Sequence, residues 1–239
     1  MSDTYEITYT FAFDNGDKRT FTIHLDRHTL ADVGPLSDAP PEWTALDFAK
    51  CPNCPLSSQQ VSCCPAAVRL AEVVKVFAQT VSYEKANVEV KVPERTYSKQ
   101  TSAQSGLSSL IGMQMAVCGC PVTAKLRPLV RLHLPFASGE ETIFRAVGMY
   151  LLGQYLEAHA GGTPDWSLKG LAELYVEIGR TNRAFAKRLR AAAEKDANVN
   201  ALTVLDTFAK VMPDSIDGRL DELRYLFTSW KETPKPTAG

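Results

Sequence analysis

The sequence has little net charge and no long apolar segment. Its 26 Lys and Arg residues nearly balance its 27 Asp and Glu residues, which leaves a formal charge of −1. A near-neutral chain has no whole-molecule attraction to nucleic acid, so nucleic acid is not expected as a partner. No window approaches the ~18 uninterrupted apolar residues of a membrane-spanning helix, so we expect no membrane association.

The first residues also lack the pattern of a secretion signal. The stretch MSDTYEITYTF carries acidic side chains and alternates in polarity, whereas a signal peptide has a basic end followed by an apolar run. We therefore predict a cytoplasmic protein. In that reducing compartment the six cysteines are not expected to form a disulfide framework.

Signatures of common catalytic sites are missing as well. The sequence contains no GxSxG, no P-loop, no GxGxxG after a strand and no HExxH. Ser105 and Ser109 could suggest a nucleophile, but the N-terminal part of a helix explains them better. Whether the protein is an enzyme stays open.

Two pairs of alternating segments predict β-hairpins. Residues 5–13 and 21–25 place apolar side chains at every second position around the turn Asp14-Asn15-Gly16-Asp17, and residues 88–92 and 95–99 follow the same rule around Pro93-Glu94. An isolated hairpin is at best marginally stable, so we expect the two hairpins to form one four-stranded antiparallel sheet.

The rest of the chain has the apolar spacing of helices. Ser138 and Glu141 fit a capping box at the start of one of them. The predicted helices cover residues 65–78, 105–117, 139–160, 167–196, 200–212 and 215–230, and Pro213 separates the last two. The predicted fold class is therefore α+β, with a small antiparallel sheet of two hairpins packed against a predominantly helical remainder.

A change in composition at Gly161-Gly162-Thr163-Pro164 suggests a boundary. We predict an α+β cysteine-containing core over residues 1–160, a helical C-terminal extension over 161–230, and a disordered polar tail over 231–239. The apolar sides of the C-terminal helices need a cover. We expect the N-terminal part of the same chain to provide it, with a homodimer through these helices as the alternative.

Six cysteines fall in three groups, and proline distinguishes among them. Cys51-Pro-Asn-Cys54 is a CxxC knuckle, which can turn two sulfurs toward one ion. A proline follows four of the six cysteines and stiffens the loop that presents each sulfur. The four are Cys51, Cys54, Cys64 and Cys120. Because Cys63 and Cys118 lack this proline, we predict that the other four form one metal site.

Four thiolates suit a closed tetrahedral zinc site, which is the first choice, and also an iron–sulfur cluster, which is the alternative. A thiol–disulfide role for Cys51 and Cys54 is weaker, because the βαβ context of thioredoxin-like proteins is missing. The cysteines could also be inert core residues.

The chain resembles a bacterial family of uncharacterised proteins that carry a domain of unknown function. The resemblance rests on WTALDFAKCPNCPL (43–56), CCPAA (63–67), QTSAQSGLSSLIGMQMAVCGCP (100–121) and LRPLVRLHLPFASGEETIFRAVGMYLL (126–152). These stretches contain the cysteine motifs CPxCPL, CCP and GCP. The resemblance implies cysteines at the positions of Cys51, Cys54, Cys64 and Cys120, and it implies no activity, substrate or cofactor.

Two further patterns have simple explanations. Arg180, Arg183, Lys187 and Arg190 form a basic stripe, with Arg188 nearby, on the side of a helix that an amphipathic pattern leaves to solvent. His133 lies in an apolar stretch and is better explained as a core histidine with satisfied hydrogen bonds than as a ligand.

The function predicted from the sequence is a non-enzymatic binding or regulatory module stapled by zinc, with an unknown protein or small-molecule partner. The alternative is an iron–sulfur or thiol redox protein.

Overall fold

The computed structural model describes residues 3–230. Its elements in chain order are β1 (Thr4–Phe13), β2 (Lys18–Asp26), the 3₁₀ helix η1 (Glu42–Thr44), α1 (Pro65–Val76), β3 (Lys85–Val92), β4 (Arg95–Ser102), α2 (Ala103–Val117), η2 (Thr123–Leu126), α3 (Pro128–Arg131), α4 (Gly139–His159), α5 (Lys169–Ala192), α6 (Ala197–Asp217) and η3 (Asp221–Trp230). The tail predicted to be disordered, residues 231–239, lies outside the described residues.

The four strands form one antiparallel sheet in the order β2-β1-β3-β4. Tyr9 of β1 is paired with Phe21 on β2 and with Val90 on β3, so β1 joins the two hairpins. The alternation read from the sequence puts one face of β1 and β3 in the core, while β4 is mostly exposed at the edge. The α+β prediction is confirmed.

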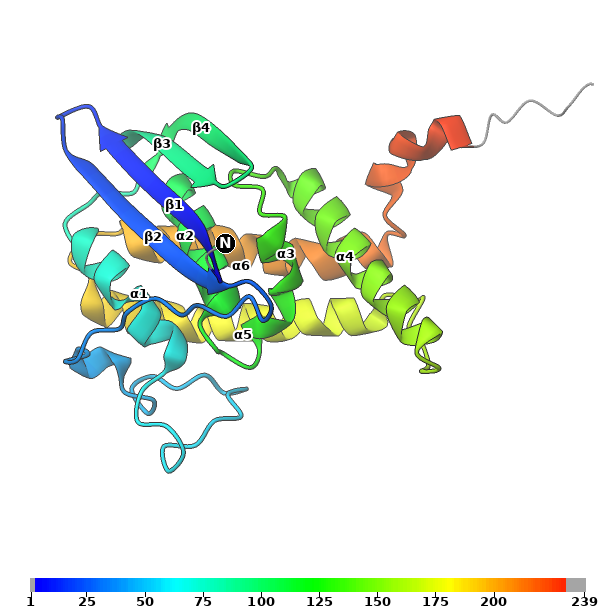
Figure 1. The fold of residues 1–239 in the computed structure, drawn as a ribbon, viewed down its shortest axis with the longest axis horizontal. Coiled ribbons are helices and arrows are strands. Elements are labelled where there is room, and N and C mark those ends of the chain that lie inside the picture. Colours follow the sequence, from blue (N-terminus) through cyan, green and yellow to red (C-terminus); the bar gives the residue numbers. More distant parts are fainter. Residues whose placement is uncertain (1–2, 231–239) are drawn as a thin grey trace, which may run out of the picture.

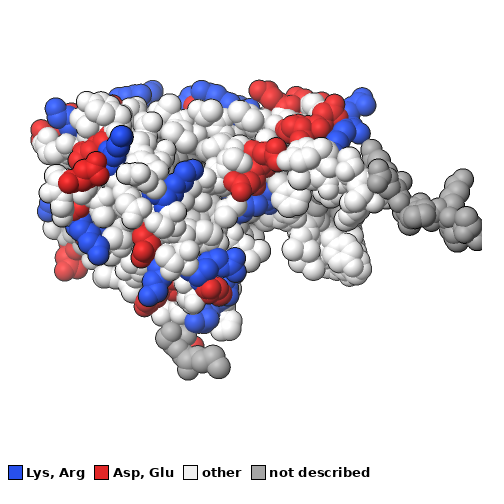
Figure 2. Space-filling model, turned by 90° about the horizontal axis from the view of Figure 1, so that it is seen from above, with Lys and Arg blue, Asp and Glu red and all other residues white. Residues whose placement is uncertain are grey.

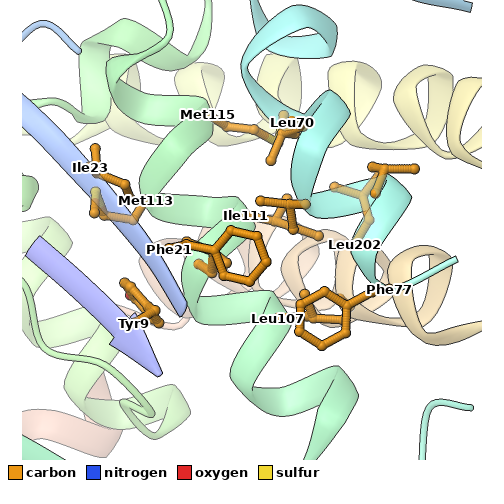
Figure 3. Close-up of a cluster of buried hydrophobic side chains, with 14 of the residues drawn as sticks. Tyr9, Phe21, Ile23, Leu70, Phe77, Leu107, Ile111, Met113, Met115 and Leu202 are labelled. Carbon is orange, nitrogen blue, oxygen red and sulfur yellow. The ribbon is translucent and has the colours of Figure 1, made fainter. Parts of the chain in front are cut away.

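Helices cover the buried face of this sheet in two layers (Figure 1). α1 and α2 lie next to the strands, and α5 and α6 lie behind them, with α6 packed along α2. α2 approaches the sheet closely at Gly106, where an added Cβ would lie 2.6 Å from a ring carbon of Phe11. Side chains from the sheet, α1, α2 and α6 meet in one buried cluster (Figure 3).

The capping box predicted at residue 138 is present. The Ser138 hydroxyl accepts from the Glu141 N–H at 3.1 Å, and the Glu141 carboxylate accepts from the Ser138 N–H at 2.7 Å. This reciprocal pair satisfies two backbone donors at the start of α4.

The predicted helix break at Pro213 is wrong, because α6 continues through it to Asp217. Proline removes one backbone donor and fixes φ near a helical value. Pro213 therefore leaves out the N–H that would donate to the Ala209 carbonyl, which weakens α6 at this point but does not end it. The chain that follows forms the 3₁₀ helix η3 and no α-helix.

The C-terminal helices share the core of the sheet. Phe185 and Leu189 of α5 and Leu202 of α6 belong to the same buried cluster as Tyr9 and Phe11. A second cluster joins α4, α5 and α6, through residues such as Ile143, Leu171 and Met212. Among residues 3–230, no helix combines the length and the apolar character that crossing a membrane would require.

Candidate metal centre

Three segments bring the Cys-Pro pairs toward α5. Cys51 and Cys54 lie in the loop between η1 and α1, where the Cys54 N–H donates to the Cys51 carbonyl at 3.0 Å and forms a tight turn. Cys64 is the N-cap of α1, with Pro65 at the first helical position. Cys120 follows α2, directly after Gly119, whose φ of +92° lets the chain reverse.

The four cysteines followed by proline surround one small cavity of about 20 Å³. Its wall consists of Cys51, Cys54, Pro55, Leu56, Cys64, Pro65, Ala66, Cys120, Pro121, Val122, Thr181 and Phe185. Three of the four prolines that follow a cysteine are part of this wall. The structure therefore brings together the four residues that proline had selected in the sequence.

Cys63 and Cys118 are absent from that wall. Cys63 pairs with Ala45 in a short antiparallel bridge, and its sulfur lies 3.8 Å from the Thr44 hydroxyl. Cys118 is buried at the end of α2, where its thiol donates to the Met115 carbonyl at 3.2 Å. Both thiols have contacts of their own away from the cavity.

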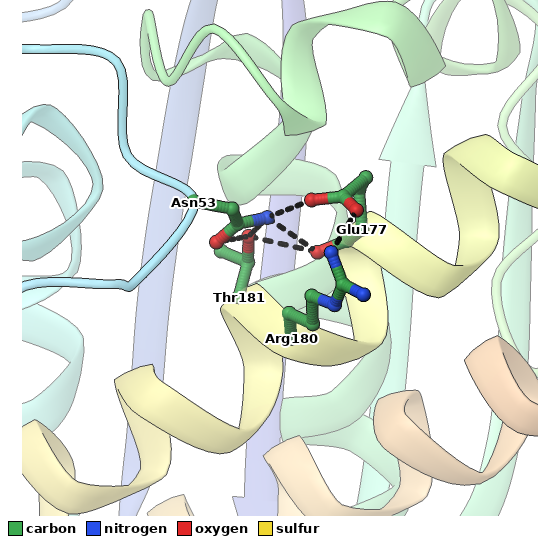
Figure 4. Close-up of polar contacts among 4 residues, drawn as sticks. All are labelled: Asn53, Glu177, Arg180 and Thr181. Carbon is green, nitrogen blue, oxygen red and sulfur yellow. Dashed lines mark hydrogen bonds and ion pairs between the residues drawn. The ribbon is translucent and has the colours of Figure 1, made fainter.

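The middle of the CxxC turn is anchored on α5 through Asn53 (Figure 4). Its amide nitrogen donates to the Glu177 carbonyl at 2.9 Å and to the Glu177 carboxylate at 2.8 Å. The Thr181 hydroxyl donates to the Asn53 side-chain oxygen at 3.4 Å. Glu177 is held in turn by Arg180 at 2.6 Å. These contacts fix the loop so that Cys51 and Cys54 face the helix.

A buried arginine, which sequence reasoning missed, lies beside the site. Arg188 is only 1% exposed, and its guanidinium donates to the carbonyls of Trp43, Ala45 and Leu46. The same short segment, residues 43–46, also contacts the residues just before α1, since the Cys64 N–H donates to the Thr44 carbonyl at 2.8 Å.

Helical spacing in the sequence could have identified Arg188 as a buried residue. Arg188 lies three residues after Phe185 and ten after Ile178, on the buried side of α5, whereas the basic stripe occupies the other side. Arg180, Arg183, Lys187 and Arg190 are all exposed, as an amphipathic helix predicts.

The Cys51 and Cys64 thiols are protonated at neutral pH as long as no cation is near. Burial, and then the charges of Cys64, Cys120 and Cys54, raise the pKa of Cys51 to about 12. Burial also raises the pKa of Cys64. Hydrogen bonds from the Ala67 and Ala66 N–H groups and the positive charge of Arg188 lower it in part. Four thiolates in this cavity would repel one another unless a metal ion compensated them.

The donor set has the chemistry of a zinc or iron–sulfur site: a CxxC turn, a sulfur at a helix N-terminus and a fourth Cys from a separate segment. Within residues 3–230, however, no group of three or more His, Cys, Asp or Glu side chains is positioned to hold a metal ion. The four thiols thus surround a cavity without forming a closed coordination sphere.

The remaining candidates from the sequence are structural. The Tyr9 hydroxyl hydrogen-bonds to His133 and lies 3.0 Å from the Ser109 hydroxyl, and burial lowers the pKa of His133 to about 3. His133 is therefore a neutral histidine with a partner. Figure 2 shows basic and acidic side chains interspersed on one face rather than a continuous basic surface.

Comparison with known proteins gives one match. A family model described as a domain of unknown function (DUF6901) matches residues 7–228. Neither a curated protein nor a solved structure matches the chain.

Proposed function

Because the chain belongs to the DUF6901 family, a domain of unknown function, its role has to be inferred from its residues, and we propose that it is a binding module stapled by one structural metal ion. The ligands are Cys51, Cys54, Cys64 and Cys120, and the ion is zinc. The observation that carries the proposal is that these four cysteines, and neither of the other two, line one cavity.

The metal would act through the fold. When bound, it supplies coordination energy that couples the loop after the first hairpin to the start of α1 and to the end of α2. Binding would require the four sulfurs to converge on the ion, with Asn53 keeping the CxxC turn on α5. Arg188 offsets part of the negative charge that four thiolates bring. A reducing, cytoplasmic compartment suits this arrangement, since all six cysteines are unpaired.

An iron–sulfur cluster is the second candidate, because the same four thiolates would serve it. Protein purified without chelator separates the two: a zinc protein is colourless and contains about one zinc per chain, whereas a cluster protein is brown and contains iron and sulfide. Protein that contains no metal and whose stability does not change when zinc or iron is supplied would contradict both candidates.

Matched serine variants test which cysteines bind. Serine at any of Cys51, Cys54, Cys64 or Cys120 is expected to remove the metal. The controls are Cys63→Ser and Cys118→Ser, which should retain it at full occupancy. Loss of metal in either control, or retention in all four ligand variants, would refute the ligand set.

The sequence predicted, as an alternative, a homodimer through the C-terminal helices, and we propose one through η3 together with α4, which lies against η3. α4 exposes Leu152, Tyr155 and Leu156, and η3 exposes Tyr225 and Trp230, which is apolar surface that a second copy could cover. Light scattering coupled to size exclusion should give twice the monomer mass. Leu152→Glu combined with Leu156→Glu should return the monomer, and a monomeric wild type would exclude the dimer.

A further inference from the structure

A second, much larger cavity lies between the helices, separate from the cysteines. Its volume is about 570 Å³, in the range of small-molecule sites. β4, α2, the segment from η2 to α4, α5 and α6 supply its wall. Most of that wall is apolar: Met113, Met115, Leu126, Leu129, Val130, Leu134, Phe136, Ile178, Val204, Leu205 and Phe208.

One cation, Arg145, lies in this wall and forms no ion pair closer than 4 Å with the described residues. Arg145 of α4 uses Nη2 to donate to the carbonyls of Leu129 and Leu132, at 3.1 and 2.8 Å. Glu141, which also lines the cavity, is the acidic residue whose charge reaches Arg145, and its carboxylate accepts a hydrogen bond from the Ser138 N–H in the capping box. Arg145 therefore keeps N–H groups that no side chain among residues 3–230 accepts. A half-buried guanidinium with free donors favours an anion.

Two unpartnered hydrogen-bonding groups on α5 line the same cavity. Tyr175 is within electrostatic range of Arg145, and its hydroxyl has no hydrogen-bond partner in the described part of the chain. Asn182 is 2% exposed, and its amide nitrogen likewise lacks an acceptor. The two are seven residues apart, about 10 Å along the helix, so one ligand could meet Tyr175 and Arg145 at one end and Asn182 further along.

The other polar cluster at this wall is already satisfied. Tyr9, Ser109 and His133 hydrogen-bond among themselves. Other polar residues, among them Ser108 and Thr123, also line the wall, and we expect Arg145, Tyr175 and Asn182 to contribute most to ligand recognition.

We propose that this cavity binds a small apolar carboxylate, whose carboxylate meets Arg145 and the Tyr175 hydroxyl while its hydrocarbon part fills the space between α2, α5 and α6. A single guanidinium offsets one negative charge and matches the planar, two-oxygen shape of a carboxylate. The exposed Lys99 at the same wall adds attraction for an anion at the surface. This ligand site is separate from the proposed metal site, and the proposal does not depend on a bound metal.

The two cavities share a wall. On α5, Thr181 lines the cysteine cavity and the next residue, Asn182, lines the large one; after α2, Val122 and Thr123 are divided in the same way.

Calorimetric titration of the full chain with decanoate, and with 1-decanol as the uncharged analogue, tests the proposal. We expect decanoate to bind at least tenfold more tightly than decanol, because the charged hydrogen bonds are absent with the alcohol. Arg145→Met should abolish that preference. Tyr175→Phe, which removes only a hydroxyl, should weaken decanoate about tenfold. Val204→Phe, which fills the cavity, should weaken both compounds.

The matched control is Arg190→Met, which removes an exposed arginine from α5 and should bind decanoate like the wild type. If Arg145→Met fails to fold, Tyr175→Phe and Val204→Phe still decide the question. No binding of decanoate up to its solubility, equal binding of decanol, or unchanged binding by both of these variants would overturn the proposal.

Discussion

Arg188→Met probes the link between the buried arginine and the cysteines. The guanidinium donates to three backbone carbonyls of residues 43–46, a segment that forms an isolated bridge with Cys63 through Ala45. Methionine keeps much of the side-chain volume and leaves those carbonyls without a donor.

The expected loss of stability follows from those bonds. Each buried acceptor left unsatisfied costs ~1–3 kcal/mol, and removing an unpaired buried charge returns part of that sum. We expect a net loss of about 3 kcal/mol in the free energy of unfolding, which corresponds to a fall in Tm of roughly 6–12 °C for a chain of this size.

The same variant should weaken metal binding, because Arg188 offsets thiolate charge. Changes in groups that surround metal ligands typically cost ~10–100-fold in affinity. Chemical denaturation measures the first effect, and zinc competition against a chromophoric chelator measures the second. Arg190→Met is the control for charge on α5. Unchanged stability and unchanged zinc affinity in Arg188→Met would refute the reasoning.

Three further predictions concern the fold. Gly106→Ala should destabilise the protein by roughly 1–3 kcal/mol in urea titrations, since the new Cβ would overlap the Phe11 ring; a neutral result would show that α2 can move away from the sheet. His133 takes up its proton at about pH 3 in the folded state and near pH 6.5 when unfolded. Folding stability should therefore fall as pH drops from about 6.5 toward 3, by up to about 1.4 kcal/mol per pH unit. His133→Gln should have a shallower slope, and equal slopes would contradict the assignment. Truncation after Ala160 should unfold the remaining part, because Phe185 and Leu202 share its core; a fragment with full thermal stability would make the C-terminal helices a separate domain.

Local patterns predicted the strands and most helices, because period-two alternation and capping residues act within a few positions. The sheet followed from β1, whose apolar face alternates without interruption. The effect of Pro213 was misjudged, since a proline in a helix loses one hydrogen bond to the preceding turn and does not always end the helix. The C-terminal residues 221–230 carry a helical apolar spacing and still form a 3₁₀ segment.

That these four cysteines line one cavity was predictable, because a proline follows each of them in the sequence. Arg188 was obscured by neighbouring arginines, although its position three residues after Phe185 places it on the buried side. The large cavity had no signal at all. It is a space that four separate helical segments leave open, and neither Arg145 nor Tyr175 differs in the sequence from an ordinary helix residue.

The wall shared by the two cavities has a thermodynamic consequence. Consecutive residues of α5 face opposite cavities, so a displacement of that turn moves both linings. If occupancy of one cavity changes the affinity of the other by some factor, linkage requires the reverse effect to have the same factor. Carboxylate titrations with and without zinc, paired with zinc titrations with and without carboxylate, would complete that thermodynamic cycle. They would give the coupling free energy between two cavities that lie on either side of one helix turn.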